Sequence, residues 1–119
     1  MNIKQIVNDT LSNDEQLTNL IGQNKIWFIK APATENPFIT FFIYDEYGKL
    51  YTDDIEEKTE YKVQVDIWSE TDYTEIEERV VEVMENNNFT RASAQDFYED
   101  DSNIYHKVLR YNYIKERGR

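Results

Sequence analysis

Cysteine is absent from this chain of 119 residues. Disulfides, thiolate nucleophiles and the zinc or iron–sulfur sites that need cysteine ligands are therefore excluded. Glycine (3) and proline (2) are scarce, which favours regular helices and strands over coil. The first ten residues are too polar for a signal peptide, and no apolar run approaches the roughly 18 residues of a membrane span. We expect a soluble protein that makes no membrane contact.

Positive charge is also in short supply. The 13 Lys and Arg residues face 24 Asp and Glu residues, which leaves a net charge of −11. Phosphate contacts need clustered basic side chains, so we expect no direct nucleic-acid binding. Residues 105–119 nevertheless carry a local balance of +4, and the rest of the chain carries −15. This asymmetry suits charge-matched contacts between neighbouring copies or partners; a solvated acidic surface with a basic tail at 115–119 is the alternative.

Apolar residues (39%) and aromatic residues (14%) suffice for an ordinary core, and the length predicts a single domain over 1–119. Residues 61–68 alternate between apolar and polar side chains, which predicts a strand with one buried face. Further strands are predicted at 25–30, 38–44, 89–98 and 105–114. The run at 38–44 is apolar on both faces, as in a central strand covered on two sides. Residues 45–60, with seven acids and two lysines, are predicted to form a long hairpin loop.

Helical spacing marks two regions. Asn2 and Gln5 resemble a capping box that opens a helix over 3–11, and Ser12 with Glu15 repeats the pattern before a stripe at Leu17, Leu20 and Ile21. These two short segments form either two helices or one bent helix. Asp72 with Glu75 is predicted to cap the major helix, whose buried face carries Ile76, Val80 and Val83. The expected fold is α+β: an antiparallel sheet of about four strands with two helices packed on one face.

No combination of residues predicts catalysis. His106 is the only histidine, and Asp96 or Asp100 is the carboxylate best placed to orient it across the final hairpin. Glu60 and Lys62 have the E-x-K spacing of metal-dependent nucleases, with Asp53 or Asp54 upstream, yet a basic groove is missing. The acidic clusters at 53–57 and 99–101 lack the ligand spacing of a calcium loop. We expect no enzyme, no catalytic residue, no cofactor and no metal.

Aromatic and charged residues instead predict protein interfaces. Tyrosine is favoured there because it combines a large apolar body with a polar tip; the alternative is that these rings only cap sheet edges. Reversing the charges of Lys107 and Arg110 to glutamate is predicted to weaken assembly. The interface candidates are Lys107, Arg110, Tyr105, Tyr111, Glu78, Glu82, Asp53, Asp54, Glu56 and Glu57.

Three stretches resemble one family. They are N-P-F-I-T-F from Asn36, Y-K-V-Q-V-D-I-W-S from Tyr61 running straight into a helix, and I-Y-H-K-V-L-R-Y-N-Y from Ile104. Their arrangement is similar to that of the tail-completion or tail-terminator proteins of long-tailed bacteriophages. The resemblance implies a non-enzymatic virion protein that assembles in the host cytoplasm as a ring, usually a hexamer. Such a ring stops tail-tube growth and joins the tail to the head connector.

Two further hypotheses follow from the charge. Within a ring, the acidic segment 45–60 would line the lumen and repel passing DNA. The rival interpretation is an acidic DNA mimic that inhibits a host nuclease or restriction system. A mimic should be a monomer or a dimer, whereas a terminator should form rings, so the native mass separates the two.

Overall fold

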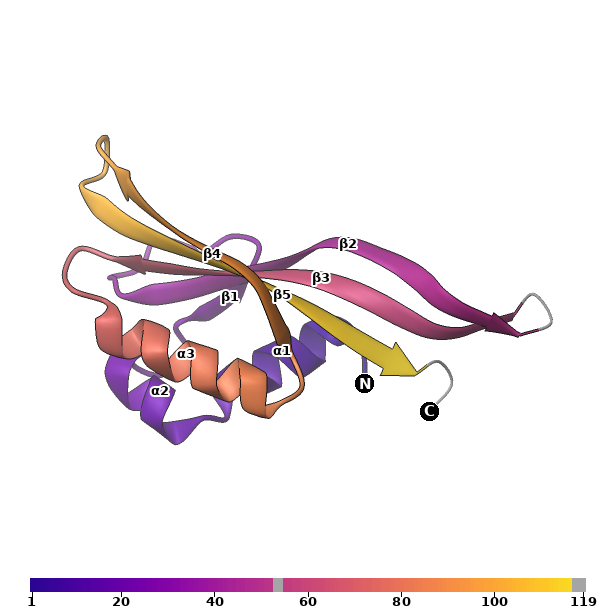
Figure 1. Cartoon of the computed structure of the whole chain (residues 1–119). Coiled ribbons are helices and arrows are strands. Elements are labelled where there is room, and N and C mark those ends of the chain that lie inside the picture. Colours follow the sequence, from indigo (N-terminus) through magenta and orange to yellow (C-terminus); the bar gives the residue numbers. More distant parts are fainter. Residues whose placement is uncertain (53–54, 117–119) are drawn as a thin grey trace.

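A computed structural model describes residues 1–52 and 55–116, with side chains placed for 1–48 and 58–116. In this part of the chain a five-stranded sheet carries three helices on one face (Figure 1). The strand order is β1-β2-β3-β5-β4, and every neighbouring pair is antiparallel except β1 with β2. The α+β class is confirmed, with one more strand and one more helix than expected.

The first two helices are separate elements. Helix α1 (Ile3–Ser12) opens with the predicted capping box: the Gln5 backbone N–H donates to the Asn2 side chain, and the Gln5 side chain accepts from the Asn2 backbone. Helix α2 (Glu15–Ile21) is capped by Asp14 and not by Ser12, which remains the last residue of α1. Because α2 begins at residue 15, its buried face carries residues 17, 18 and 21, and the predicted stripe residue Leu20 is exposed.

The sheet is built around one long hairpin. Strands β2 (Phe38–Thr52) and β3 (Ile55–Ser69) pair from Phe38 opposite Trp68 out to Thr52 opposite Ile55. The short strand β1 (Ile26–Phe28) flanks β2 on one side. On the other side β5 (Ile104–Glu116) pairs with β3, and β4 (Thr90–Glu99) forms the far edge.

The prediction of a loop over 45–60 is wrong: both strands continue through this segment as far as the structure describes it. The antiparallel ladder continues outward from the buried part of the hairpin, and it needs no apolar side chains to do so. Register shifts follow Ile43, Gly48 and Leu50, and such bulges bend and twist a ribbon. The hairpin therefore projects as an arm beyond the helices (Figure 1), in a molecule 52 Å long and 28 Å wide.

Helix α3 (Thr74–Asn86) lies across the inner face of the sheet and completes the core. Its N-cap is Tyr73; the predicted cap Asp72 lies one residue earlier and accepts hydrogen bonds from the Thr74 backbone and hydroxyl at 2.9 and 2.6 Å. The predicted stripe of α3 is buried, together with Met84. The core also includes Val7, Leu11, Leu17, Ile39, Phe41, Val63, Val65, Ile67, Phe89, Leu109 and Tyr111.

The outer face of the sheet, opposite the helices, has no second layer of described chain over it (Figure 1). The prediction that 38–44 is covered on two sides is therefore wrong. Ile39 and Phe41 face the helices and are buried, whereas Phe42 on the outer face is only half-buried. The apolar side chains on that outer face therefore remain partly accessible to solvent.

Candidate interaction surfaces

A row of rings crosses four strands on the outer face. The register places Phe38 of β2, Trp68 of β3, His106 of β5 and Phe97 of β4 side by side. Successive ring centroids lie 6.1, 3.7 and 6.0 Å apart, and Trp68 stacks on His106 at an interplanar angle of 13°. Contacts of this kind across strands stabilise a sheet and fix its register. Phe97 ends the row at the sheet edge, 47% exposed.

A polar network lies beside this ring row. His106 Nε2 lies 2.7 Å from Asp66 Oδ1, and Gln64 Nε2 donates to the same oxygen at 2.8 Å. Arg110 Nε donates to Gln64 Oε1 at 2.9 Å. Asp66 is 3% exposed, and a buried carboxylate needs such donors. Glu99, 3.3 Å from His106 Nδ1, is the other carboxylate at this histidine, so neither Asp96 nor Asp100 takes the place predicted for it. We assign His106 a structural role.

Lys107 points to the opposite, helix-facing side of the sheet. Its Nζ lies 3.0 Å from Asp96 and 3.2 Å from Glu77, and the residue is 7% exposed. Burial lowers the pKa of Lys107, but hydrogen bonds to Asp96 and Glu77 outweigh it, and the net direction is upward. The Tyr73 hydroxyl also donates to Asp96, which lowers the pKa of that carboxyl. The ammonium charge of Lys107 is thus neutralised within the chain, so no interface is supported at this residue.

The other interface candidates divide between core and surface. Tyr111 is fully buried, and its unpaired hydroxyl lies in the core, so no interface is supported there. Tyr105 is 42% exposed and contacts Tyr73 and Tyr98. Arg110 is exposed over the Tyr44 ring, 4.7 Å from its centroid, and makes no ion pair with the described residues. Of the acidic candidates, Glu78 and Glu82 are exposed on α3, while Asp53 and Asp54, and the side chains of Glu56 and Glu57, lie outside the described residues.

The E-x-K pair forms a local ion pair. Lys62 Nζ lies 3.1 Å from Glu60 and also donates to Asn112 at 2.9 Å, while the Tyr47 hydroxyl donates to Glu60. The hydrogen bond to Glu60 is the main cause that raises the pKa of Lys62. Among the described residues, no three acidic or histidine side chains are placed to hold a metal ion. These contacts connect β3 to β2 and to β5 where the arm begins.

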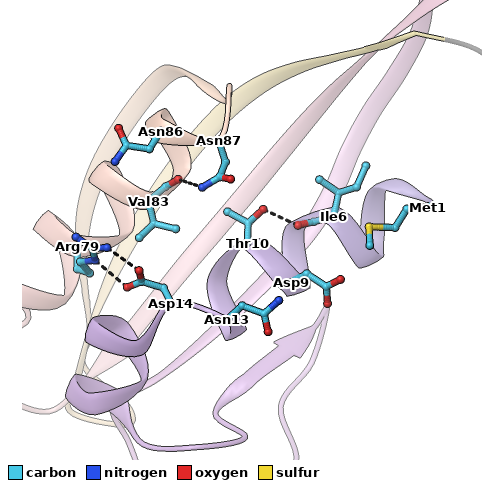
Figure 2. Close-up of a pocket in the computed structure, with 10 residues that line it drawn as sticks. All are labelled: Met1, Ile6, Asp9, Thr10, Asn13, Asp14, Arg79, Val83, Asn86 and Asn87. Atoms are coloured by element: carbon cyan, nitrogen blue, oxygen red, sulfur yellow. Dashed lines mark hydrogen bonds and ion pairs between the residues drawn. The ribbon is translucent and has the colours of Figure 1, made fainter. Parts of the chain in front are cut away.

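A shallow pocket of about 400 Å³ lies between α1 and α3 (Figure 2). On one wall, Arg79 donates to both Asp14 oxygens at 2.7 and 2.6 Å, in the bidentate geometry that makes such pairs strong. The pair joins the start of α2 to α3. The hydrogen bond from Arg79, with a further one from the Leu17 backbone, lowers the pKa of Asp14 against the effect of burial.

Replacing Asp14 by asparagine should flatten the acid unfolding curve of the protein. Because the folded-state pKa of Asp14 is lowered, its contribution is present above the unfolded value near 3.9 and is lost as pH falls through the folded value. At neutral pH we expect the substitution to lower the free energy of unfolding by about 1–2 kcal/mol, because the ion pair with Arg79 is lost. The asparagine side chain can still cap α2. Urea unfolding between pH 2 and 7 measures both effects. An unchanged pH profile would contradict the ion pair.

These features define a class: a small α+β protein with one uncovered sheet face and a projecting hairpin arm. Within the described residues, no helix has the length and apolar character to cross a membrane. The chain matches the family model described as Tail completion protein gp17 over residues 6–116, nearly its whole length. The chain therefore belongs to this phage tail-completion family. No curated protein matches it.

Family membership confirms the resemblance and fixes the broad function. The chain is a structural protein of phage tail assembly and not an enzyme, and it belongs to the virion together with other tail and head proteins. The contact between Asp66 and His106 and the Asp14–Arg79 pair were not predicted from the sequence. Each joins residues that only the folded chain brings together.

Proposed function

We propose that six copies form a ring on the head-proximal end of the tail tube, where the ring stops tube growth and joins the tail to the head connector. The match of nearly the whole chain to the tail-completion family carries this proposal. The acidic segment 45–60 would line the channel and repel DNA that passes through it.

The distribution of charge and exposure supports a ring closed by head-to-tail contacts, in which each copy offers two different surfaces. Helix α3 presents Glu75, Glu78 and Glu82 to solvent, while the opposite sheet face presents Arg110. Since Lys107 is neutralised internally, a charge reversal tests assembly only at Arg110. The reversal Lys107→Glu would instead place a third carboxylate beside Asp96 and Glu77.

The experiment is a tail-tube assay with purified components. Tail-tube protein polymerised in the presence of the chain should give shorter tubes than the tube protein alone, each with a ring at one end in electron micrographs. Heads bearing their connector should then attach at that end only. Tubes of unchanged length with no density at either end would overturn the proposal.

The same preparation tests the rival DNA mimic. In a DNA mimic, the carboxylates should be spaced along one face of the protein as phosphates are along DNA. In this chain several carboxylates are instead engaged in ion pairs: Asp14 with Arg79, and Glu77 and Asp96 with Lys107. A native mass of one or two copies, together with inhibition of a nuclease, would favour the mimic over the ring.

A further inference from the structure

Strand β4 forms one edge of the sheet: it pairs with β5 on one side and with no described strand on the other. All ten of its residues are exposed on both faces, including Phe97 and Tyr98 at 47% each. Proteins usually protect such an edge with proline, lysine or a covering element, because its unpaired backbone groups can pair with another chain. Strand β4 contains neither of these residues, and its single register shift lies near its start, between Arg91 and Ser93.

A second free edge lies on the opposite side of the sheet, along β2. Strand β1 pairs only with residues 39–41, and the last bond there runs from the Ile29 N–H to the Phe41 carbonyl at 2.8 Å. Ile29 has a positive φ of 65°, where the chain leaves the sheet. From residue 42 to Thr52, β3 is the one strand among the described elements whose backbone pairs with β2.

A hollow of about 430 Å³ opens beside this free edge, just where β1 ends. It is lined by Ile3 and Lys4 of α1, Phe28 of β1 and residues 43–46 of β2. Phe28 is 37% exposed, and Lys4 Nζ lies 4.6 Å from its ring centroid. Lys4 makes no ion pair within the described part of the chain. The hollow thus offers apolar surface, the ammonium group of Lys4 and the carboxylates of Asp45 and Glu46 to an added strand.

We propose that β4 of a second copy adds to the free edge of β2, in the manner of β-strand addition. This contact rests on the proposed ring and specifies how neighbouring subunits join. Strands β2 and β5 run in one direction, β3 and β4 in the other, so a head-to-tail neighbour brings β4 antiparallel to β2. That is the more stable ladder.

Strand β4 is about as long as the free part of β2, and its Tyr98 side chain can contact the hollow. If the ten residues of β4 cover the free edge from its tip inward, Thr90 lies near the arm tip and Glu99 near residue 42. Tyr98, which points to the helix-facing side, then reaches the hollow, while Phe97 continues the row of rings on the outer face. The acidic turn at 99–101 approaches Lys4, which also faces Asp45 and Glu46 there. The neighbouring copy must be shifted along the strand direction so that its β4 passes β1. A similar shift between strands allows tilted strands to close into a barrel.

Cysteine cross-linking tests the contact without background, because the chain has no cysteine of its own. In this alignment Gln95 lies opposite Glu46, so we choose Glu46→Cys and Gln95→Cys with a flexible bismaleimide that tolerates a small shift. The double variant should give a ladder of covalent multimers. A mixture of the two single variants should stop at the dimer, at least about tenfold more abundant than with either single variant alone, because the contact raises the local thiol concentration.

Native mass spectrometry of the uncross-linked protein separates the possible failures. A ring that yields no ladder would overturn the edge contact but leave the proposed function standing. Self-linking of Gln95→Cys alone would indicate a two-fold contact instead, and a ladder from Ile29→Cys with Gln95→Cys would assign the partner edge to β1. A chain that stays monomeric, alone and with tail tubes, would overturn the ring and this contact with it.

Discussion

A chain whose arm is shortened should stay folded and fail to form rings. We would replace residues 49–58 by Asn-Gly, a two-residue turn that closes the hairpin between Gly48 and Thr59, which already pair. The change removes the outer part of the free β2 edge, where a neighbouring β4 would pair. Each lost backbone hydrogen bond contributes about 0.5–1.5 kcal/mol, so losing several should weaken association by more than about 100-fold.

The measurement is native mass over a range of protein concentrations, with thermal unfolding as the test of the fold. The core residues described lie in the helices and in the sheet outside the removed segment, so the melting temperature should change little. A matched control keeps the arm and neutralises its acids, with Asp53→Asn, Asp54→Asn, Glu56→Gln and Glu57→Gln. This control should still assemble, because strand addition uses the backbone. Rings formed by the shortened chain would refute the role of the arm.

The second large effect is expected at His106, and it is an effect on stability. Replacing His106 by alanine removes a partner 2.7 Å from the carboxylate of Asp66, which is 3% exposed, and removes the ring stacked on Trp68. Asp66 then keeps the Gln64 donor but loses its second partner, and removing a partner from a buried carboxylate typically costs about 1.5–3 kcal/mol. We expect a loss of about 3 kcal/mol, or roughly 10 °C in melting temperature for a chain of this size.

Two further substitutions separate the hydrogen bond from the stacked ring. His106→Phe keeps a ring beside Trp68 but has no donor, so it should be nearly as unstable as His106→Ala. His106→Gln has a donor for Asp66 and should recover about half of the loss. Urea unfolding measures all three variants with the m-value as a check on the fold. Stabilities within about 0.5 kcal/mol of the parent for all three would show that Asp66 does not depend on His106.

Local patterns in the sequence predicted the elements that carry a buried face. The capping box at Asn2 and the apolar spacing of α3 each lie within one turn or a few turns of helix, and the strand at 61–68 alternates cleanly. The length of the hairpin was missed because strands 45–52 and 55–60 owe their structure to pairing. Charged residues do not prevent this pairing, because the ladder is made of backbone hydrogen bonds.

Contacts between distant residues account for the remaining errors. Asp66 and His106 are forty positions apart, and nothing near either residue indicates that the register of β3 and β5 brings them together. Lys107 was predicted to lie in an interface, because nothing near it in the sequence indicates its partners Glu77 and Asp96, which come from two other elements. The position of Tyr111 in the core follows from its packing with Phe89 and the rest of the core. Surface charge in a sequence is therefore a poor guide to available charge in the fold.

The absence of β4 from the hydrophobic core has an evolutionary consequence. Apart from Asp96, which pairs with the buried Lys107, the residues of β4 can mutate without opening the core, so most of the strand is free to diverge between related phages. If β4 mates with β2 of the next copy, one gene encodes both halves of the match. A compensating change then arises in every copy at once, and related rings co-infecting one cell can diverge until they no longer mix.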